Sequence, residues 1–556
     1  MDVQEYVKLY KDKGTIRAVA RCVGGSFHAS RTLYKEAVEA GLLEPRRRGR
    51  QTRDEVKETI LVGRVKAVPT SEFAVPPKGT VRRYILTCAQ NNTSLHLELW
   101  ENLLALARHY DARVMVSRFV YDKRSQSADL DKKVATGKTA KEQAGIEWDP
   151  RVHPHLADDR VELAPGLVWC GEMNILPTAV RPLSGLEAYT GRKSSVVPHV
   201  KLAMVSVPSG KYEATKFVYT TGTVTQRNYI QRKEGLKAEF HHCYGALLVE
   251  VDGEGDWFVR QLNADSCGTL HDLDLRVEGG VVTTGNHVEA ISWGDIHAIR
   301  LNKMVEELAW GHAPGQRDFC MEWALKPRYQ FMHDLLDFRA RNHHEIKDPH
   351  KMFKRWAEGE DSVYEELHVT FQFLKRVAAE AGGEVIVVDS NHDNALKRWV
   401  NETSYKTDPG NALIFLALEI ATYKAMLAKD DWFHLLEWAE VHVTKGVSGA
   451  RFLREDESFI ICPDANGGIE CGMHGHLGPN GSRGGATSFA RMGRKAVVGH
   501  THQAGITDGV YVAGTSSDLD LEYNKGPGSW SHSHVVTYPN GKRAIITMWN
   551  GKWRAV

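Results

Sequence analysis

The sequence lacks paired cysteines, a strong net charge and a long uninterrupted apolar run. Its eight cysteines include no CxxC pair, which argues against disulfides and against a thiolate zinc site. The formal net charge of +1 gives no overall basic field, so nucleic acid would have to be bound through local patches. The charged start, MDVQEYVKLYKDKG, is unlike a signal peptide. We therefore expect a protein of the cytoplasm, which is a reducing compartment.

No apolar stretch predicts a membrane span. The most apolar helical segment, ALIFLALEIATYKAML, is interrupted by Glu419 and Lys424, and it predicts a buried helix. With 42% apolar and 25% charged residues, the composition is typical of a globular protein. The chain of 556 residues is too long for one ordinary core, so we expect about two to four domains.

Residues 1–60 predict a small helical domain. Apolar residues share one helical face over residues 16–23, a glycine pair follows, and residues 28–40 form a second amphipathic stretch. This order resembles a helix-turn-helix DNA-binding unit. Five arginines come soon after it, Arg46, Arg47, Arg48, Arg50 and Arg53, and the first four are the candidate DNA contacts. They suit DNA phosphates or a minor groove; the alternative is an oligomerisation module with a solvated linker.

Residues 61–285 predict a mixed α/β middle domain. The segments RRYILTCAQ, HLELWENLLALARHY and ARVMVSRFVY are typical of a strand, a helix and a second strand. His241 and His242 are adjacent, so on a strand they would face opposite sides and could not serve one site. A scaffold or a nucleic-acid-binding surface is the expected use of this region.

Residues 286–556 carry the candidate chemistry. Short apolar runs end there in residue types that bind metals, and these residues are Asp295, His297, Asp334, Asn391, His474, His500 and His502. In open α/β sheets, ligand sites lie beyond the carboxyl ends of the strands. Each element alone is common, but the ordered series predicts a shared metal site.

The series D-x-H, D-x-x-D, N-H-D, H-G and G-H-x-H resembles the calcineurin-like metallophosphoesterase superfamily over the last half of the chain. The resemblance implies an α/β fold, a sandwich of mixed sheets flanked by helices. Two positions depart from the family pattern, because His333 and Ser390 stand where glycines are usual. Neither change removes a ligand, and His333 could add a contact behind the ligands or to substrate.

The resemblance also implies how two divalent ions would be held. Asp334 would bridge them. Asp295, His297 and His502 would complete the first site, and Asn391, His474 and His500 the second. This set of nitrogen and oxygen ligands suits manganese, which we expect, or iron, zinc or nickel.

A hydroxide between two such ions could attack phosphorus directly, so no protein nucleophile is needed. His392 follows ligand Asn391 and is the expected general acid or transition-state stabiliser, with Asp393 orienting its ring. The alternative for His392 is a buried imidazole with a purely structural role.

The substrate is predicted from the attached regions, because the superfamily includes phosphatases, phosphodiesterases and nucleases. Across the whole chain, segments such as TTGTVTQRNYIQRK and YILTCAQNN resemble the pre-early DNA transfer proteins of tailed bacteriophages that inject their genome in two steps. This resemblance implies a DNase of the infected bacterial cytoplasm, linked to host DNA degradation or phage DNA transfer. Its expected partners are DNA and either further copies of the chain or another phage protein. The alternatives are a phosphatase or small-molecule phosphodiesterase, and a non-catalytic DNA-binding regulator.

Overall fold

The computed structural model describes residues 2–13, 19, 22–23, 27–43, 75–121, 147–211, 213–311, 319–342, 345–465, 467–521 and 523–556. The chain forms two compact units, Met1–Val62 and Gly63–Val556.

The first unit contains α1 (Val3–Lys13) and α3 (Phe27–Glu39). Tyr6 and Tyr34 are buried between these helices, and the rings of Tyr10 and Tyr34 lie 5.0 Å apart. The amphipathic helix predicted over residues 28–40 is confirmed by α3. Arg46, Arg47, Arg48 and Arg50 lie outside the described residues, as does the predicted glycine turn, so the DNA-binding role of this unit stays a prediction.

A four-stranded sheet opens the second unit, in the order β2-β1-β8-β9. Its elements are β1 (Val81–Gln90), α5 (Leu97–Tyr110), β2 (Ala112–Phe119), β8 (Gly245–Asp252) and β9 (Trp257–Asn263). Strands β1 and β2 are parallel and α5 connects them, which confirms the predicted strand–helix–strand unit. A small three-stranded sheet follows, with β10 (Leu270–Asp272), β11 (Leu275–Glu278) and β12 (Val281–Thr283).

A ten-stranded sheet has the order β17-β18-β19-β21-β20-β6-β7-β5-β4-β3. Its strands are β3 (Arg160–Ala164), β4 (Leu167–Cys170), β5 (Ser194–Val197), β6 (Met204–Val207), β7 (Lys216–Thr220), β17 (Ile460–Ile461), β18 (Ile469–Glu470), β19 (Lys495–Val498), β20 (Gly505–Thr507) and β21 (Val510–Val512). Met204 of β6 pairs with Ile506 of β20. Strands on both sides of residue 285 therefore share one sheet, and the boundary predicted there does not separate compact units.

A six-stranded mixed sheet has the order β16-β15-β14-β13-β22-β23. Its strands are β13 (Ala290–Ser292), β14 (Tyr329–Met332), β15 (Glu384–Val387), β16 (Arg451–Phe452), β22 (Ser533–Thr537) and β23 (Arg543–Thr547). Strands β13 to β16 are parallel, whereas β22 runs antiparallel to β13. A sheet of parallel strands is normally covered on both faces, and this sheet is packed on both.

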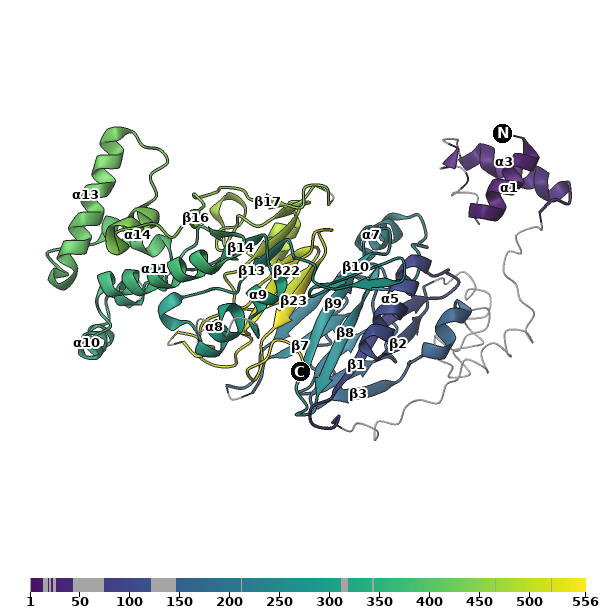
Figure 1. Cartoon of the computed structure of the whole chain (residues 1–556), viewed down its shortest axis with the longest axis horizontal. Helices are drawn as coiled ribbons and strands as arrows, with labels where there is room; N and C mark the ends of the chain where they lie inside the picture. Colours follow the sequence, from purple (N-terminus) through teal and green to yellow (C-terminus); the bar gives the residue numbers. More distant parts are fainter. Residues whose placement is uncertain are drawn as a thin grey trace. The chain divides into compact units, whose positions relative to one another are not determined.

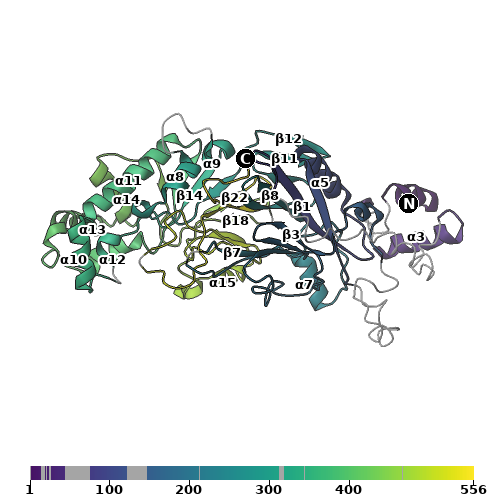
Figure 2. The same cartoon turned by 90° about the horizontal axis from the view of Figure 1, so that it is seen from below.

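Alternate residues of this sheet enter two different cores, as the pleat of a strand requires. Phe331 packs in the same core as Val497 and Ile506 of the ten-stranded sheet. The next residue, Met332, packs with Phe371 of α11 (Val363–Glu380) on the other face. The result is a mixed α/β arrangement in which two sheets share a core and helices cover the outer face (Figures 1 and 2).

The remaining helices of this unit are α7 (Lys233–His241), α8 (Lys303–Trp310), α9 (Met321–Leu325), α10 (Pro349–Glu358), α12 (Asn394–Glu402), α13 (Ala412–Ala428), α14 (Leu435–Thr444) and α15 (Ala486–Ala490). Short 3-10 turns occur at η3 (Pro150–His155), η4 (Ala298–Arg300), η6 (Arg339–Arg341), η7 (Pro409–Asn411) and η8 (Pro479–Gly481). His241 ends α7, so the assumption that it and His242 lie on a strand is wrong.

The prediction that ALIFLALEIATYKAML is a buried helix is wrong for most of its residues, because five of the 17 residues of α13 are buried. Ile414 and Leu418 of α13 are buried, but Leu413 and Leu427 are 88% and 85% exposed. Apolar side chains lie on both faces of this helix, and only one face meets the core. By length and composition the segment Pro409–Ala428 could cross a membrane, although core helices of soluble proteins pass the same test.

Candidate metal centre

The predicted ligands lie in loops that follow strands of the two packed sheets. Asp295, Asp334 and Asn391 come soon after the parallel strands β13, β14 and β15, whose carboxyl ends meet at one edge. His474 and the histidines of GHTH follow β18 and β19 of the other sheet. The structure therefore brings side chains from both sheets to one place.

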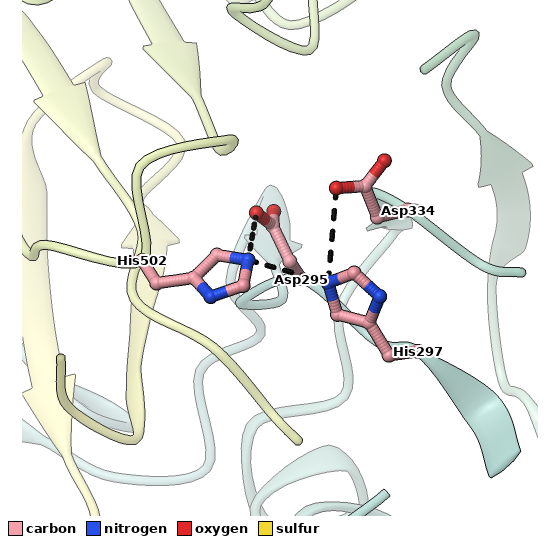
Figure 3. A group of neighbouring side chains, drawn as sticks. All are labelled: Asp295, His297, Asp334 and His502. Carbon is pink, nitrogen blue, oxygen red and sulfur yellow. Dashed lines mark hydrogen bonds and ion pairs between the residues drawn. The ribbon is translucent and has the colours of Figure 1, made fainter. Parts of the chain in front are cut away.

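The first group consists of Asp295, His297, Asp334 and His502, all buried, with ligand atoms within 4.8 Å of one another (Figure 3). His502 Nε2 lies 3.0 Å from Asp295 Oδ2 and 3.2 Å from His297 Nε2. His297 Nε2 is also 3.8 Å from Asp334 Oδ2. Two imidazole nitrogens and two carboxylates thus converge, which is a donor set for a divalent cation.

The second group meets the first at Asp334. His474 Nε2 lies 3.2 Å from Asp334 Oδ2 and 3.1 Å from Asn391 Oδ1. The ring of His500 lies 5.3 Å from that of His474, centroid to centroid, and its backbone N–H donates to Asp295 Oδ2 at 2.8 Å. Asp334 Oδ2 therefore faces a histidine of each group, and its bridging role stays a prediction.

Four of these residues have a left-handed backbone. The φ angles are +46° at His297, +46° at Asp334, +72° at His500 and +57° at His502. Non-glycine residues seldom adopt this conformation, which costs about 1–3 kcal/mol per residue and is concentrated at functional sites. The surrounding sheets hold these loops in a conformation that the isolated segments would not prefer.

Gly499, the residue before His500, permits the closest approach in the centre. A Cβ atom at this position would lie 2.2 Å from Asp295 Oδ1 and 3.2 Å from the Cβ of His333. No side chain fits there, because 2.2 Å is far inside van der Waals contact. The glycine that precedes HTH in the sequence is therefore required by the packing against Asp295.

The electrostatics of the first group fit a cation. Burial alone would raise the pKa of Asp295, but His474 and His502 hold it below its ordinary value. Burial would likewise lower the pKa of His297, but Asp337 and then Asp334 raise it to about 9. Asp295 Oδ1 has no hydrogen-bond partner among the described residues.

The same balance governs the second group. Burial opposes ionisation of Asp334, yet His474 and His392 hold its pKa well below the ordinary range. Burial would lower the pKa of His474, and the charges of Asp334 and Asp295 instead raise it to about 9. Buried carboxylates thus attract positive charge to this point, and a metal would displace protons from the histidines.

His392 lies at the more accessible edge of the centre, with a side chain that is 19% exposed. Its backbone N–H donates to Asp334 Oδ1 at 3.3 Å. Its ring Nδ1 lies 2.8 Å from the backbone oxygen of Asp337, so Nδ1 carries the proton and donates to that carbonyl. This geometry leaves Nε2 as the ring nitrogen available to a substrate.

The prediction that Asp393 orients the ring of His392 is wrong. The carboxylate of Asp393 accepts hydrogen bonds from the backbone N–H of Leu336 and the hydroxyl of Ser390, each at 2.8 Å. It therefore stabilises the loop that carries His392. Burial, together with the charge of Asp334, raises the pKa of Asp393 to about 7.

The residue that lies against the ring of His392 is Asp337, to which the sequence analysis assigned no role. Its carboxylate Oδ1 lies 3.0 Å from His297 Nδ1 and 3.7 Å from His392 Nδ1. Burial opposes its ionisation, while His297, His392 and Arg300 lower its pKa. The sequence did contain a signal for this role, since Asp337 is the second aspartate of the D-x-x-D element. A buried carboxylate at that position needs a cationic or imidazole partner.

Ser390 and His333, which stand where the family pattern has glycines, lie in different surroundings. The hydroxyl of Ser390 donates to the carboxylate of Asp393. His333 is fully buried, its ring lies 5.6 Å from that of His474, and burial lowers its pKa to about 4. A fully buried ring cannot contact a substrate, so His333 lies behind the ligands as a neutral imidazole.

A second acidic group is formed by Asp252, Glu254 and Asp256. The ammonium of Lys552 lies 2.7, 2.5 and 2.9 Å from their respective carboxylates. Lysine therefore supplies the positive charge in this group.

No family model matches the sequence. The chain is 39% identical to Protein A1 of Escherichia phage T5 over 482 residues, which cover 85% of this chain and 83% of that protein.

Proposed function

Because this chain belongs to the family of Protein A1 of Escherichia phage T5, we propose that it acts during phage infection as a metal-dependent phosphodiesterase on DNA. The observation that carries the proposal is the position of Asp334, whose Oδ2 faces His297 of the first group and His474 of the second. A carboxylate placed between two sets of nitrogen and oxygen donors suits a dinuclear centre.

In this proposal Asp295, His297 and His502 would hold the first ion, and Asn391, His474 and His500 would hold the second, with Asp334 serving both. Manganese is the expected ion, and iron, zinc and nickel suit the same ligands. Bound divalent ions would polarise the phosphate and lower the pKa of a water, which supplies the nucleophile.

The protein's own contribution to bond cleavage is made by His392. Its Nδ1–H is fixed on the Asp337 carbonyl, so a proton on Nε2 can pass to the oxygen of the departing nucleotide. Asp337 also fixes His297 through Nδ1. One residue thus positions both a ligand and the proton donor.

DNA is proposed as the substrate because a phage protein with a helical first unit and an arginine cluster is suited to a phosphate polymer. The proposed setting is the infected bacterial cytoplasm, where the protein would degrade host DNA or support phage DNA transfer. A phosphatase would use the same centre, so substrate assays must separate the two.

The test is to strip the purified protein of metal and assay it with plasmid, linear duplex, single strand and a chromogenic phosphodiester, with manganese, iron, zinc or nickel added back. We expect chelator-sensitive cleavage of DNA that manganese restores best. Asp334→Ala should abolish it, whereas Asp431→Ala, at an exposed position, should not. Turnover of phosphomonoesters alone would support a phosphatase, and no turnover with any metal would refute the proposed activity.

A further inference from the structure

A pocket lies directly beside the metal centre. Its lining includes Asp337, which holds His297 and His392, together with Arg300, Leu521 and Tyr523. Arg300 ends the short turn η4 that begins one residue after His297. The pocket therefore shares Asp337 with the support of His297 and His392.

The three arginines of this pocket differ in their partners. Arg339 forms an ion pair with Glu360, and Arg355 forms one with Glu345. Within the part of the chain that the structure describes, the side chain of Arg300 forms no ion pair or hydrogen bond. Arg300 lies close enough to Asp337 to lower the pKa of that carboxyl, but its guanidinium N–H groups donate no hydrogen bond to it, and they suit a phosphate bound in a bidentate manner.

An aromatic surface runs from the metal ligands to the same pocket. The ring of Trp530 lies 4.2 Å from that of His502, centroid to centroid, and Tyr523 lies 5.9 Å from Trp530. Tyr523 is 48% exposed, so part of its ring is available to a ligand. An accessible aromatic ring next to an arginine is the combination that binds single-stranded nucleic acids.

We propose that this pocket binds one unstacked nucleotide of a single-stranded nucleic acid, with its base against Tyr523 and its phosphate on Arg300. The inference rests on the proposed phosphodiesterase function and names the form of its substrate. In an intact duplex each base is covered by its neighbours and cannot reach the tyrosine ring. Single strands and frayed ends present such a base without the cost of unstacking it.

The inference is tested by binding, measured as fluorescence anisotropy in EDTA so that no cleavage occurs. The probes are a labelled single-stranded oligonucleotide, its duplex, and a strand of the same length with abasic residues throughout. The wild-type protein should bind the natural strand about tenfold or more tightly than the abasic strand, since stacking contributes about 1–3 kcal/mol per base.

Two sets of variants identify the residues. Tyr523→Ala should lose the preference for bases, and Tyr523→Phe, which keeps the ring, should retain it. Arg300→Gln should weaken binding of both strands by a similar factor, because it removes a charged partner of the phosphate. The controls are Tyr405→Ala and Arg328→Gln, which change exposed residues outside the pocket.

The inference is overturned if Tyr523→Ala keeps the wild-type preference, if Tyr523→Phe behaves like Tyr523→Ala, or if the wild-type protein binds natural and abasic strands equally. Cleavage with metal is measured separately. Base-dependent binding without any cleavage would refute the proposed activity and support the pocket, whereas cleavage without base dependence would refute the pocket alone.

Discussion

The imidazole of His392 is held by the main chain of Asp337, whose carbonyl oxygen lies 2.8 Å from Nδ1. A backbone acceptor cannot take up the proton, so the tautomer of the ring is fixed whatever the charge on the neighbouring carboxylate. The carboxylate of the same residue faces Nδ1 of His297. One residue therefore contacts both rings, His392 through its main chain and His297 through its side chain, and the two contacts can be separated by mutation.

His392→Gln should reduce turnover by about a hundredfold or more, the scale for loss of a positioned general acid, while metal content stays near that of the wild type. Asp337→Asn should instead weaken metal binding by about 10–100-fold, because it removes the support of a ligating histidine. Metal titration by calorimetry and steady-state rates give both quantities. Equal metal loss in both variants would contradict the separate roles.

Asp334→Ala should lose both ions, since Oδ2 faces a histidine of each group. His500→Ala should retain one ion, because this residue belongs to the second group only. Elemental analysis of the purified variants measures the stoichiometry directly. Two tightly bound ions in Asp334→Ala would show that this carboxylate is not the bridge.

Gly499→Ala should disrupt the centre without touching a ligand, because the new methyl group would lie 2.2 Å from Asp295 Oδ1. We expect a loss of about 1–3 kcal/mol in the free energy of unfolding, together with weaker metal binding. Gly410→Ala is the matched control, because nothing lies within 4 Å of a Cβ built at that position. Urea unfolding of both variants would detect the difference, and equal stability would argue against the steric reason given for this glycine.

Acid should destabilise the protein through buried neutral histidines such as His534. This ring accepts the backbone N–H of Gly294 on Nδ1 at 3.0 Å, and burial followed by the charge of His532 lowers its pKa to about 3. The unfolded chain binds a proton below about pH 6.5 and the folded chain does not. Above about pH 6.5 both states carry a neutral His534, and this residue does not reduce the free energy of unfolding. As the pH drops from about 6.5 toward the folded pKa, the free energy of unfolding falls.

For one such group the loss reaches up to about 3 kcal/mol by about pH 4. His534→Gln keeps an acceptor for Gly294 and should show a shallower decline of the urea midpoint between about pH 7 and pH 4.5. His350→Gln, at an exposed position, should decline as the wild type does. A slope in His534→Gln equal to that of the wild type would contradict the assignment.

Replacing Arg46, Arg47, Arg48 and Arg50 by glutamine should weaken duplex binding and reduce its dependence on salt, by about one unit of slope for each phosphate that the protein no longer neutralises. Hydrolysis of a small chromogenic diester needs only the metal centre and should serve as the internal reference. Binding isotherms at several salt concentrations measure the slope. An unchanged slope would show that DNA is held elsewhere.

The side chains that the structure brings together as candidate ligands could be found in the sequence because strand ends and ligand residue types coincide. A short apolar run followed by Asp-x-His or His-x-His encodes both the strand and the donor atoms locally. The role of Asp337 could not be predicted in this way, because it depends on two rings brought to it by separate segments. Asp393 was assigned to the ring of His392 by adjacency in sequence, whereas its partner Leu336 lies 57 residues away.

The fold was predicted where its signal is local and missed where it is not. The strand–helix–strand unit around α5 follows from periodicity over a short window. The pairing of Met204 with Ile506 joins segments that are far apart in the chain, and no local pattern encodes which edges meet. For α13 the apolar residues surround the helix, so the sequence indicates burial although only one face has a partner.

The ten-stranded sheet also has a consequence for protein synthesis. Strand β6 pairs with β20, and β13 pairs with β22. Because β20 and β22 are translated much later than their partners, the earlier part of the chain emerges with unpaired sheet edges. Pairing of this kind closes long loops and is slow compared with local folding. The last ligands to be translated, His500 and His502, belong to the same late segments. A ribosome still translating the chain therefore carries no assembled candidate metal centre until translation is nearly finished.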